Sequence, residues 1–324
     1  FIYFGTDNGM DFYDGYTFQS YHRNSFNQNS IYGSKVNLIY EDSKNDIWVA
    51  TDLGISRLNP YKNKFTRPLK VDHLNLGSFQ NIEKIVELKD QKYIFKSGFK
   101  NSLYIFDEIK DTTYFVSCEN VEFLNDIYIN ELYLDQSNYL WLATSKGVFY
   151  FKDNYVDLIK YKKFKELNSA NINTIQKGEG SDIWFGSDRG LGFIRGGLNG
   201  SAYEFQNESD SISLVSNYIN DLDWDNKRKH LWVSTSEGIS LFDTENNTFT
   251  NFTETPYANS IKENNVGEIL IAEESGYLWF KTKNYLGINS LVRWYDTNIE
   301  DYESQFNHLE LSLIHISEPT RQEA

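Results

Sequence analysis

The chain has 324 residues, a formal net charge of −15 and 16% aromatic residues. A chain this acidic repels nucleic-acid phosphates and anionic lipid surfaces, so neither is an expected partner. Its single cysteine excludes an internal disulfide, and no apolar run is long enough to span a bilayer. The many Tyr, Phe, Asn, Asp and Ser residues favour short strands joined by polar turns over helices.

One short pattern recurs seven times along the chain, at intervals of 43–48 residues. It runs apolar, aromatic or apolar, apolar, small, Thr or Ser, and usually continues with a two-residue turn, Gly and an apolar residue. The copies are Ile2–Met10, Ile47–Ile55, Tyr93–Asn101, Leu140–Val148, Ile183–Leu191, Leu231–Ile239 and Leu278–Leu286. We expect the hydroxyl to bond to the turn backbone and the Gly to allow a positive φ.

The second position of each copy holds a large side chain in most repeats. These residues are Tyr3, Trp48, Ile94, Trp141, Trp184, Trp232 and Trp279. A large apolar ring with one N–H is suited to separating neighbouring sheets. We therefore predict that these residues are spacers between packed sheets.

A second pattern precedes every copy except the first, with two apolar residues three apart and then an acid. It is clearest in Val36/Ile39/Asp42, Ile129/Leu132/Asp135 and Ile219/Leu222/Asp225. Turn residues separate this segment from the core of the repeat, and two short, largely aromatic segments follow the core. Each repeat is thus predicted to contain four short strands.

A four-stranded unit of this length cannot bury both faces alone, so neighbouring units must stack, and radial stacking closes a ring. The sequence therefore predicts an all-β, seven-bladed β-propeller with four-stranded blades over residues 1–310. A β-helix would need shorter repeats, and a helical solenoid would need a 3.6-residue periodicity that is absent. The chain begins inside the first core, so the first blade is expected to be incomplete at the N-terminus. Either the C-terminal region supplies a strand there or an edge stays open.

The last residues, 311–324, read LSLIHISEPTRQEA and match no repeat. This segment resembles a translated sequencing adaptor. It is predicted to be an artefact rather than native sequence, and the fold prediction leaves it out. The chain is accordingly interpreted as a fragment of a larger protein.

The repeats resemble a known family. The apolar-x-x-apolar-x-x-Asp segment, the turn and the Leu/Ile-Trp-apolar-small-Thr-x-x-Gly core resemble two-component regulator propeller repeats. The opening FGTDNGMDFYDGYTFQSYHRNSFNQNSI, followed by VNLIYEDSKNDIWVATDLGISRLNP, is similar to the first two blades of hybrid two-component sensors of polysaccharide-degrading bacteria. The resemblance spans Phe1 to about Phe306 and is weaker in the third and seventh repeats.

That resemblance implies the N-terminal periplasmic propeller of an inner-membrane sensor. Such sensors carry two propellers and an immunoglobulin-like module outside the cytoplasm, one membrane helix, and then a histidine kinase, a receiver and a DNA-binding domain. They respond to oligosaccharides and control genes for glycan use. This chain has no kinase, receiver or helix-turn-helix sequence, and the family's ligand contacts follow no motif that assigns residues here.

Patterns for catalysis, metal or cofactor binding are absent from the sequence. The five histidines form no zinc motif. The Gly-rich run Gly190–Gly200 is interpreted as a loop between strands, and the acidic run Asp221–His230 as a hairpin turn. Carboxylate pairs for glycoside hydrolysis stay open, but most acids recur at one turn of the repeat and are interpreted as architectural. These acids are Asp42, Asp46, Asp135, Asp182 and Asp225. No catalytic residue, metal ligand or cofactor is predicted.

Two tryptophans lie outside the repeated position, Trp224 and Trp294. Exposed aromatic rings can stack on sugars, so both are candidate ligand-binding residues, and Trp224 is expected to face solvent at a blade end. Lys96 and Lys281 replace the small residue of the core, either lining a channel or marking degenerate blades, and we favour degenerate blades.

Three functions remain as hypotheses. The first is a periplasmic, non-enzymatic sensing module that binds an oligosaccharide and contacts other domains of the same sensor. The second is a scaffold that supports homodimerisation while the ligand binds elsewhere in the full protein. The third is a propeller lyase or hydrolase.

Overall fold

The structure is a computed structural model that describes residues 2–14, 16–69, 81–98, 101–117, 127–152, 162–163, 171–208, 213–256, 260–261, 263–272, 277–283, 289–294, 306–309 and 313–317. These residues form seven antiparallel sheets of four strands each and contain no α-helix. The chain divides into two compact units. We call them unit 1, which holds three of the sheets, and unit 2, which holds the other four, and we describe each by itself.

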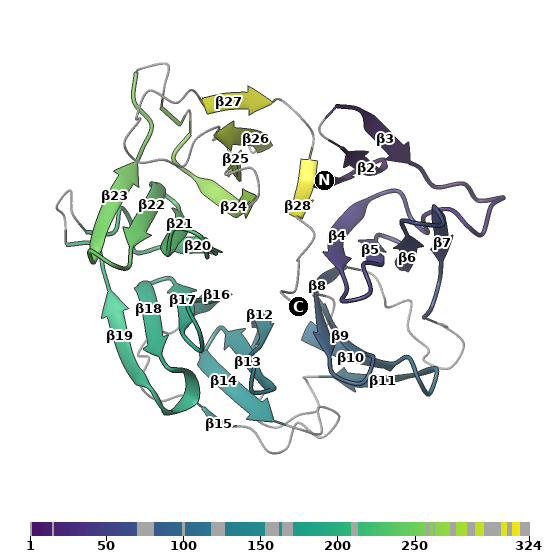
Figure 1. Ribbon diagram of the computed structural model, residues 1–324, viewed down its shortest axis with the longest axis horizontal. Helices are drawn as coiled ribbons and strands as arrows, with labels where there is room; N and C mark the ends of the chain where they lie inside the picture. Colours follow the sequence, from purple (N-terminus) through teal and green to yellow (C-terminus); the bar gives the residue numbers. More distant parts are fainter. Residues whose placement is uncertain are drawn as a thin grey trace. The chain divides into compact units, whose positions relative to one another are not determined.

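Unit 1 contains strands β1–β11 and β28 (Figure 1). Their bounds are β1 Ile2–Thr6, β2 Gly9–Tyr13, β3 Phe18–Tyr21, β4 Val36–Glu41, β5 Ile47–Thr51, β6 Ile55–Asn59, β7 Lys64–Thr66, β8 Ile82–Leu88, β9 Lys92–Ser97, β10 Ser102–Asp107, β11 Thr112–Ser117 and β28 Leu313–Ser317. Two of its sheets each consist of four consecutive strands, β4–β7 and β8–β11.

Unit 2 contains strands β12–β27 and one short 3-10 helix, η3 (Gly197–Asn199). Its strands are β12 Ile129–Leu134, β13 Tyr139–Thr144, β14 Gly147–Lys152, β15 Lys162–Lys163, β16 Ile172–Lys177, β17 Ile183–Ser187, β18 Gly190–Arg195, β19 Ser201–Phe205, β20 Ile219–Asp225, β21 His230–Thr235, β22 Gly238–Asp243, β23 Thr248–Phe252, β24 Val266–Ala272, β25 Tyr277–Lys283, β26 Asn289–Trp294 and β27 Phe306–Leu309. All four sheets run in chain order, so each repeat folds as one meander.

The first sheet has the order β28-β1-β2-β3 and takes its fourth strand from the far end of the chain. Ile316 in β28 lies opposite Phe4 in β1. The N-terminal part therefore supplies three strands, and the C-terminal region supplies the missing one, which is the first of the two alternatives above. The adaptor origin predicted for residues 311–324 stays a prediction, because strand pairing does not reveal where a sequence comes from.

The repeated tryptophans separate neighbouring sheets, as predicted. Trp48 on β5 is fully buried and packs with Ile85 and Phe95 of the following sheet. In unit 2, Trp141 packs with Ile175 of the sheet β16–β19. Trp232 likewise packs with buried apolar residues of the sheet β24–β27. Because each large ring is buried against the next sheet, each repeat depends on its neighbour for stability.

The predicted Thr/Ser–Gly turn is also confirmed. The Thr144 hydroxyl donates to the Gly147 carbonyl at 2.6 Å, and the Thr235 hydroxyl donates to the Gly238 carbonyl at 2.9 Å. Gly238 has a φ of 142°, and a Cβ there would lie 2.4 Å from the Phe252 carbonyl oxygen. Only Gly fits such a position, because both the backbone conformation and the space exclude a side chain.

The sheets of each unit approach one another most closely at their first strands. In unit 2 the strands β12, β16, β20 and β24 contact their neighbours in turn, and Figure 1 shows them side by side while the outer strands β15, β19 and β23 lie apart. Each first strand is a sheet edge, with backbone groups that no further strand pairs. Each also has an irregularity in register after its first residue, such as Ile172 to Thr174 in β16.

Candidate functional site

An asparagine follows the first residue of three consecutive first strands in unit 2, and each one bridges to the next sheet. Asn130 Nδ2 donates to the Ile172 carbonyl at 2.7 Å, and Asn173 Nδ2 donates to the Ile219 carbonyl, also at 2.7 Å. A third bond, from Asn220 Nδ2 to the Val266 carbonyl, measures 2.6 Å. These bonds satisfy backbone carbonyls of the next sheet edge.

Carboxylates on the same strands accept from backbone N–H groups of the next sheet. Glu131 Oε2 accepts from Ile175 N at 3.0 Å, and Asp221 Oδ2 accepts from Ile269 N at 3.1 Å. Asp223 Oδ2 accepts from the next free N–H along that edge, Ile271 N, at 2.6 Å. We call these asparagines and carboxylates the edge ladder: Asn130, Asn173, Asn220, Glu131, Asp221 and Asp223.

Asp221 has the most perturbed carboxyl group of the ladder. Burial, together with the negative charge of Glu131, raises its pKa to about 7, although backbone hydrogen bonds from Ile269 and Leu222 act in the opposite direction. Its Oδ1 also accepts from the Thr174 hydroxyl at 3.2 Å. Asp221 therefore changes charge near neutral pH while it joins three sheets.

Exposed aromatic residues lie just before two of these first strands. Tyr128 precedes β12 and is 68% exposed, and Tyr218 precedes β20 and is 47% exposed. Asn171 takes the equivalent place before β16. The repeat analysis missed these residues because they lie one position before the pattern on which it was built.

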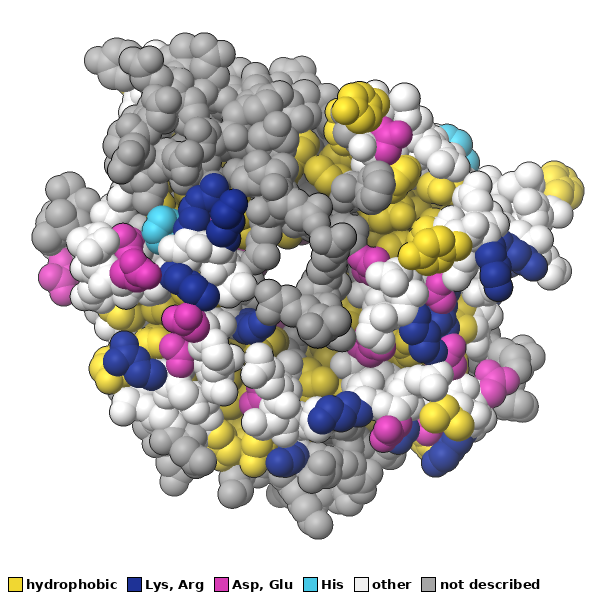
Figure 2. Space-filling model, in the orientation of Figure 1, with side chains coloured by type: hydrophobic (Ala, Val, Ile, Leu, Met, Phe, Trp, Pro, Cys, Tyr) yellow, Lys and Arg dark blue, Asp and Glu magenta, His cyan; other side chains and the backbone are white. Residues whose placement is uncertain are grey.

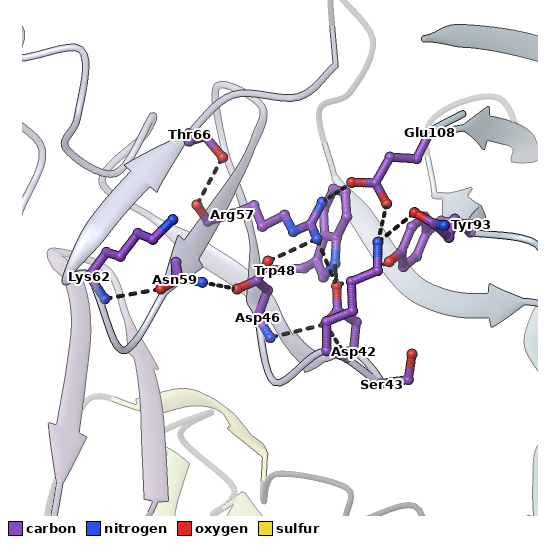
Figure 3. Close-up of polar contacts among 12 residues, drawn as sticks. Asp42, Ser43, Asp46, Trp48, Arg57, Asn59, Lys62, Thr66, Tyr93 and Glu108 are labelled. Carbon is purple, nitrogen blue, oxygen red and sulfur yellow. Dashed lines mark hydrogen bonds and ion pairs between the residues drawn. The ribbon is translucent and has the colours of Figure 1, made fainter. Parts of the chain in front are cut away.

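A different polar cluster joins two sheets of unit 1 (Figure 3). Asp42, the repeat acid after β4, accepts from the Trp48 indole at 2.9 Å and from the Tyr93 hydroxyl at 3.1 Å. Its other oxygen accepts from the backbone N–H groups of Lys44 and Asp46, at 2.9 and 3.0 Å. Asp135 holds Trp141 in the same way in unit 2, at 2.9 Å. The architectural interpretation of these acids therefore agrees with their contacts.

Arg57 on β6 is the cation of this cluster, which we call the Arg57 clasp. Its guanidinium lies 2.6 Å from Glu108 Oε1, 2.8 Å from Asp46 Oδ2 and 3.5 Å from Asp42 Oδ2. Glu108 follows β10 on the next sheet and also pairs with Lys44 at 2.9 Å. Although burial opposes the charge of Arg57, the three carboxylates raise its pKa, so it remains a cation.

The arginine occupies a place that some of the other sheets give to an aromatic residue. Arg57 lies opposite Trp48 in the register, as Tyr150 lies opposite Trp141, and its guanidinium sits 5.1 Å from the Trp48 ring centroid. Stacking on the ring keeps the apolar contact, while the charged edge reaches the three carboxylates. The clasp is thus a structural ion-pair network at a buried turn.

The structure places Trp224 away from solvent, and the expectation that it faces solvent is wrong. It is 7% exposed and belongs to the core cluster that includes Trp184 and Leu222. Side chains alternate along a strand, so Trp224 shares the inward face of β20 with Leu222. A ring buried there presents no face to a sugar. Trp294 is the last residue of β26, and its side chain lies outside the described residues.

The two core lysines form ion pairs within their own sheets. Lys96 is 5% exposed and pairs with Glu83, and Lys281 lies 3.9 Å from Glu268. In the described ranges, no group of three or more His, Cys, Asp or Glu side chains is placed to hold a metal ion. No helix in the described part of the chain has the length and apolar character needed to cross a membrane.

No family model and no curated protein matches the sequence. Among solved structures, the Swd1 β-propeller domain of Myceliophteria thermophila is similar at 11% identity and a TM-score of 0.57, over 82% of this chain and 84% of that one. Virginiamycin B lyase from Staphylococcus aureus is similar at 17% identity and a TM-score of 0.59, over 88% and 86%.

An extracellular domain assigned to a hybrid two-component system of B. thetaiotaomicron matches at 15% identity and a TM-score of 0.46. The match covers 94% of this chain but 49% of that one, and it is too distant to carry a conclusion. The four-stranded sheets, together with the two likenesses above, show that this chain is a β-propeller. At such identities they establish the fold alone.

Proposed function

We propose that this chain is the extracytoplasmic sensing module of a hybrid two-component sensor, located in the periplasm, and that it binds an oligosaccharide. The observation that carries the proposal is the repeat itself. Its apolar-x-x-apolar-x-x-Asp segment and Trp core resemble two-component regulator propeller repeats from Phe1 to about Phe306. That resemblance implies a β-propeller, and the chain folds as a β-propeller.

The distribution of polar groups supports a binding module. The repeat acids and the edge ladder are engaged in joining turns and sheets, as the bonds of Asp42 and Asn173 illustrate. Aromatic residues at the ends of first strands, by contrast, are exposed, as Tyr128 is. A rigid framework with exposed rings at its ends suits recognition better than a site formed by the framework's own acids.

Charge favours an uncharged ligand. The net charge of −15 opposes the approach of polyanions. Figure 2 shows one face of the molecule, on which Lys and Arg side chains lie among Asp and Glu side chains. The mixed charges coloured on that face form no broad attractive surface for a polyelectrolyte, which together with the net charge favours a neutral glycan over an acidic one.

The full-length gene and its product test the proposal. We expect the reading frame to continue into further propeller repeats, a membrane segment and a histidine kinase. In membranes that contain the full protein, an added oligosaccharide should change kinase autophosphorylation. A reading frame without a kinase would overturn the sensor assignment.

Two other results would favour the other hypotheses. Product formation from a polysaccharide by the purified chain would favour a lyase or hydrolase. Dimer formation by the chain, with the glycan bound by another part of the full sensor, would favour the scaffold.

A further inference from the structure

We infer that the ends of three neighbouring sheets in unit 2 form a binding site for a neutral oligosaccharide, with Tyr128 and Tyr218 as stacking platforms and Asn171 between them. This inference rests on the proposed function and identifies the residues that carry it out. We call these three residues the strand-end site. They occupy the same position, one residue before β12, β20 and β16 respectively.

The backbone fixes all three residues in the same way. The Tyr128 carbonyl accepts from Ser145 N at 2.9 Å, and the Asn171 and Tyr218 carbonyls each accept at 3.1 Å from the residue that follows the second strand of their own sheet. Tyr128 N also donates to the Ser145 hydroxyl at 3.0 Å. Because their backbones are tied to the sheets, the three side chains leave from the same end of adjacent sheets. Little ordering is then required when a ligand binds.

Exposure leaves the two rings available. Tyr128 is 68% exposed and Tyr218 is 47% exposed, whereas the repeated tryptophans nearby are buried. An aromatic ring offers an apolar face to the C–H groups of a sugar, and the phenol hydroxyl can bond to its hydroxyls. Tyrosine supplies this contact area with few rotatable bonds, which keeps the entropic cost of binding low.

Asn171 supplies oriented polar groups between the rings. Its Oδ1 accepts from Asn130 Nδ2 at 2.9 Å, and its Nδ2 donates to Asn173 Oδ1 at 2.9 Å. These bonds to the edge ladder fix the plane of the amide and leave it one N–H and one lone pair. A donor and an acceptor side by side match the hydroxyls of a sugar.

The spacing indicates an oligosaccharide rather than a single sugar. One complete sheet, β16–β19, lies between the sheets that carry the two tyrosines, since β16 contacts both β12 and β20. Packed sheets lie about 10 Å apart, so two such steps separate the rings by roughly 20 Å. A monosaccharide can contact one ring, but several linked units are needed to contact both.

Titration calorimetry of the purified chain tests this site. The probes are neutral hexasaccharides built from glucose, xylose, mannose, galactose or arabinose units, each compared with its monosaccharide. We expect at least one hexasaccharide to bind, with an affinity at least tenfold higher than that of its monosaccharide. Tyr128→Ala and Tyr218→Ala should each raise Kd about tenfold, which corresponds to the loss of one stacking contact.

Two variants serve as controls. Tyr128→Phe should keep most of the affinity, because it retains the ring, and Tyr61→Ala should leave Kd unchanged, because Tyr61 is 84% exposed on a turn of unit 1. Unchanged unfolding midpoints will show that the alanine variants are folded. Hexasaccharide binding that survives both alanine substitutions would overturn the strand-end site and leave oligosaccharide sensing intact. Failure of every hexasaccharide to bind the unmodified chain would overturn both.

Discussion

The two units join neighbouring sheets with different chemistry. In unit 1 the sheets β4–β7 and β8–β11 are linked by charges, with Arg57 reaching Glu108 at 2.6 Å. In unit 2 the sheets are linked chiefly by side chains that bond to backbone groups of the next edge, as Asn173 does to the Ile219 carbonyl, and one ion pair, Lys229 with Glu179 at 3.1 Å, also joins two of them. The same repeat therefore tolerates two kinds of joint. The difference teaches that a shared strand pattern does not determine how one repeat holds the next.

The largest expected effect comes from the repeat acids. Asp42→Ala leaves two buried donors, the Trp48 indole and the Tyr93 hydroxyl, without their acceptor and removes the most distant carboxylate of Arg57, so it should lower the free energy of unfolding by about 3–5 kcal/mol. Asp135→Ala leaves one such donor, the Trp141 indole, without its acceptor, so it should cost only about 1–3 kcal/mol. Denaturant unfolding of the two variants measures both values. Equal losses would show that the bond from Tyr93 and the ion pair with Arg57 add nothing to the joint.

The next effect is a pH dependence that belongs to unit 2. Asp221 keeps its proton up to about pH 7 in the folded chain and loses it near pH 3.8 when unfolded. The folded state therefore binds more protons between these values. Its contribution to stability is fully present below about pH 4 and is lost as the pH rises to 7, with a slope of up to about 1.4 kcal/mol per pH unit.

Asp221→Asn should flatten that slope between pH 5 and pH 7 in denaturant-unfolding experiments. Asp243→Asn is the control, because, although burial raises the pKa of Asp243, the hydrogen bonds from Asn246 and Glu245 together lower it below its usual value. That carboxyl contributes stability above its unfolded pKa and loses it at lower pH, outside the measured window. An unchanged slope in Asp221→Asn would mean that this carboxyl is ionised in the fold.

Single rungs of the edge ladder should have intermediate effects. Asn173→Ala leaves the Ile219 carbonyl without its side-chain donor and should cost about 1–2 kcal/mol in the free energy of unfolding. Asn37 on β4 occupies the same repeat position in unit 1, where the described residues show no side-chain hydrogen bond for it. Asn37→Ala should therefore cost less than about 0.5 kcal/mol. Similar losses for the two variants would contradict a ladder specific to unit 2.

The smallest effect belongs to the exposed rim of the Arg57 clasp. Lys44 pairs with Glu108 at 2.9 Å, but its side chain is 39% exposed. Lys44→Ala should cost less than about 1 kcal/mol at low salt, and the cost should shrink further in 1 M salt because exposed pairs are screened. Unfolding midpoints at two salt concentrations give this comparison. A loss that salt leaves unchanged would show that the pair acts as a buried one.

Features that depend on residues close in sequence were predictable. The hydroxyl-to-Gly turn at Thr235 and Gly238 involves residues three apart, and the acid Asp42 caps a turn of its own hairpin. The edge ladder was not predictable, because Asn173 and its acceptor Ile219 are 46 residues apart. The Ile-Asn pair that begins β12, β16 and β20 was a visible signal, but the repeat pattern treated its second residue as variable.

The amino-acid sequence by itself determined the strands, their meander order and the tryptophan between sheets, because these follow from local alternation, turns and burial. Tertiary structure decided which side chains meet across the sheets. It buried Trp224, exposed Tyr128 and raised the pKa of Asp221, since each outcome depends on what the neighbouring sheet brings to that place. The exposure of a side chain and the charge of a carboxyl group depend on the residues packed around them. The sequence pattern of one strand does not specify which residues the neighbouring sheet places there.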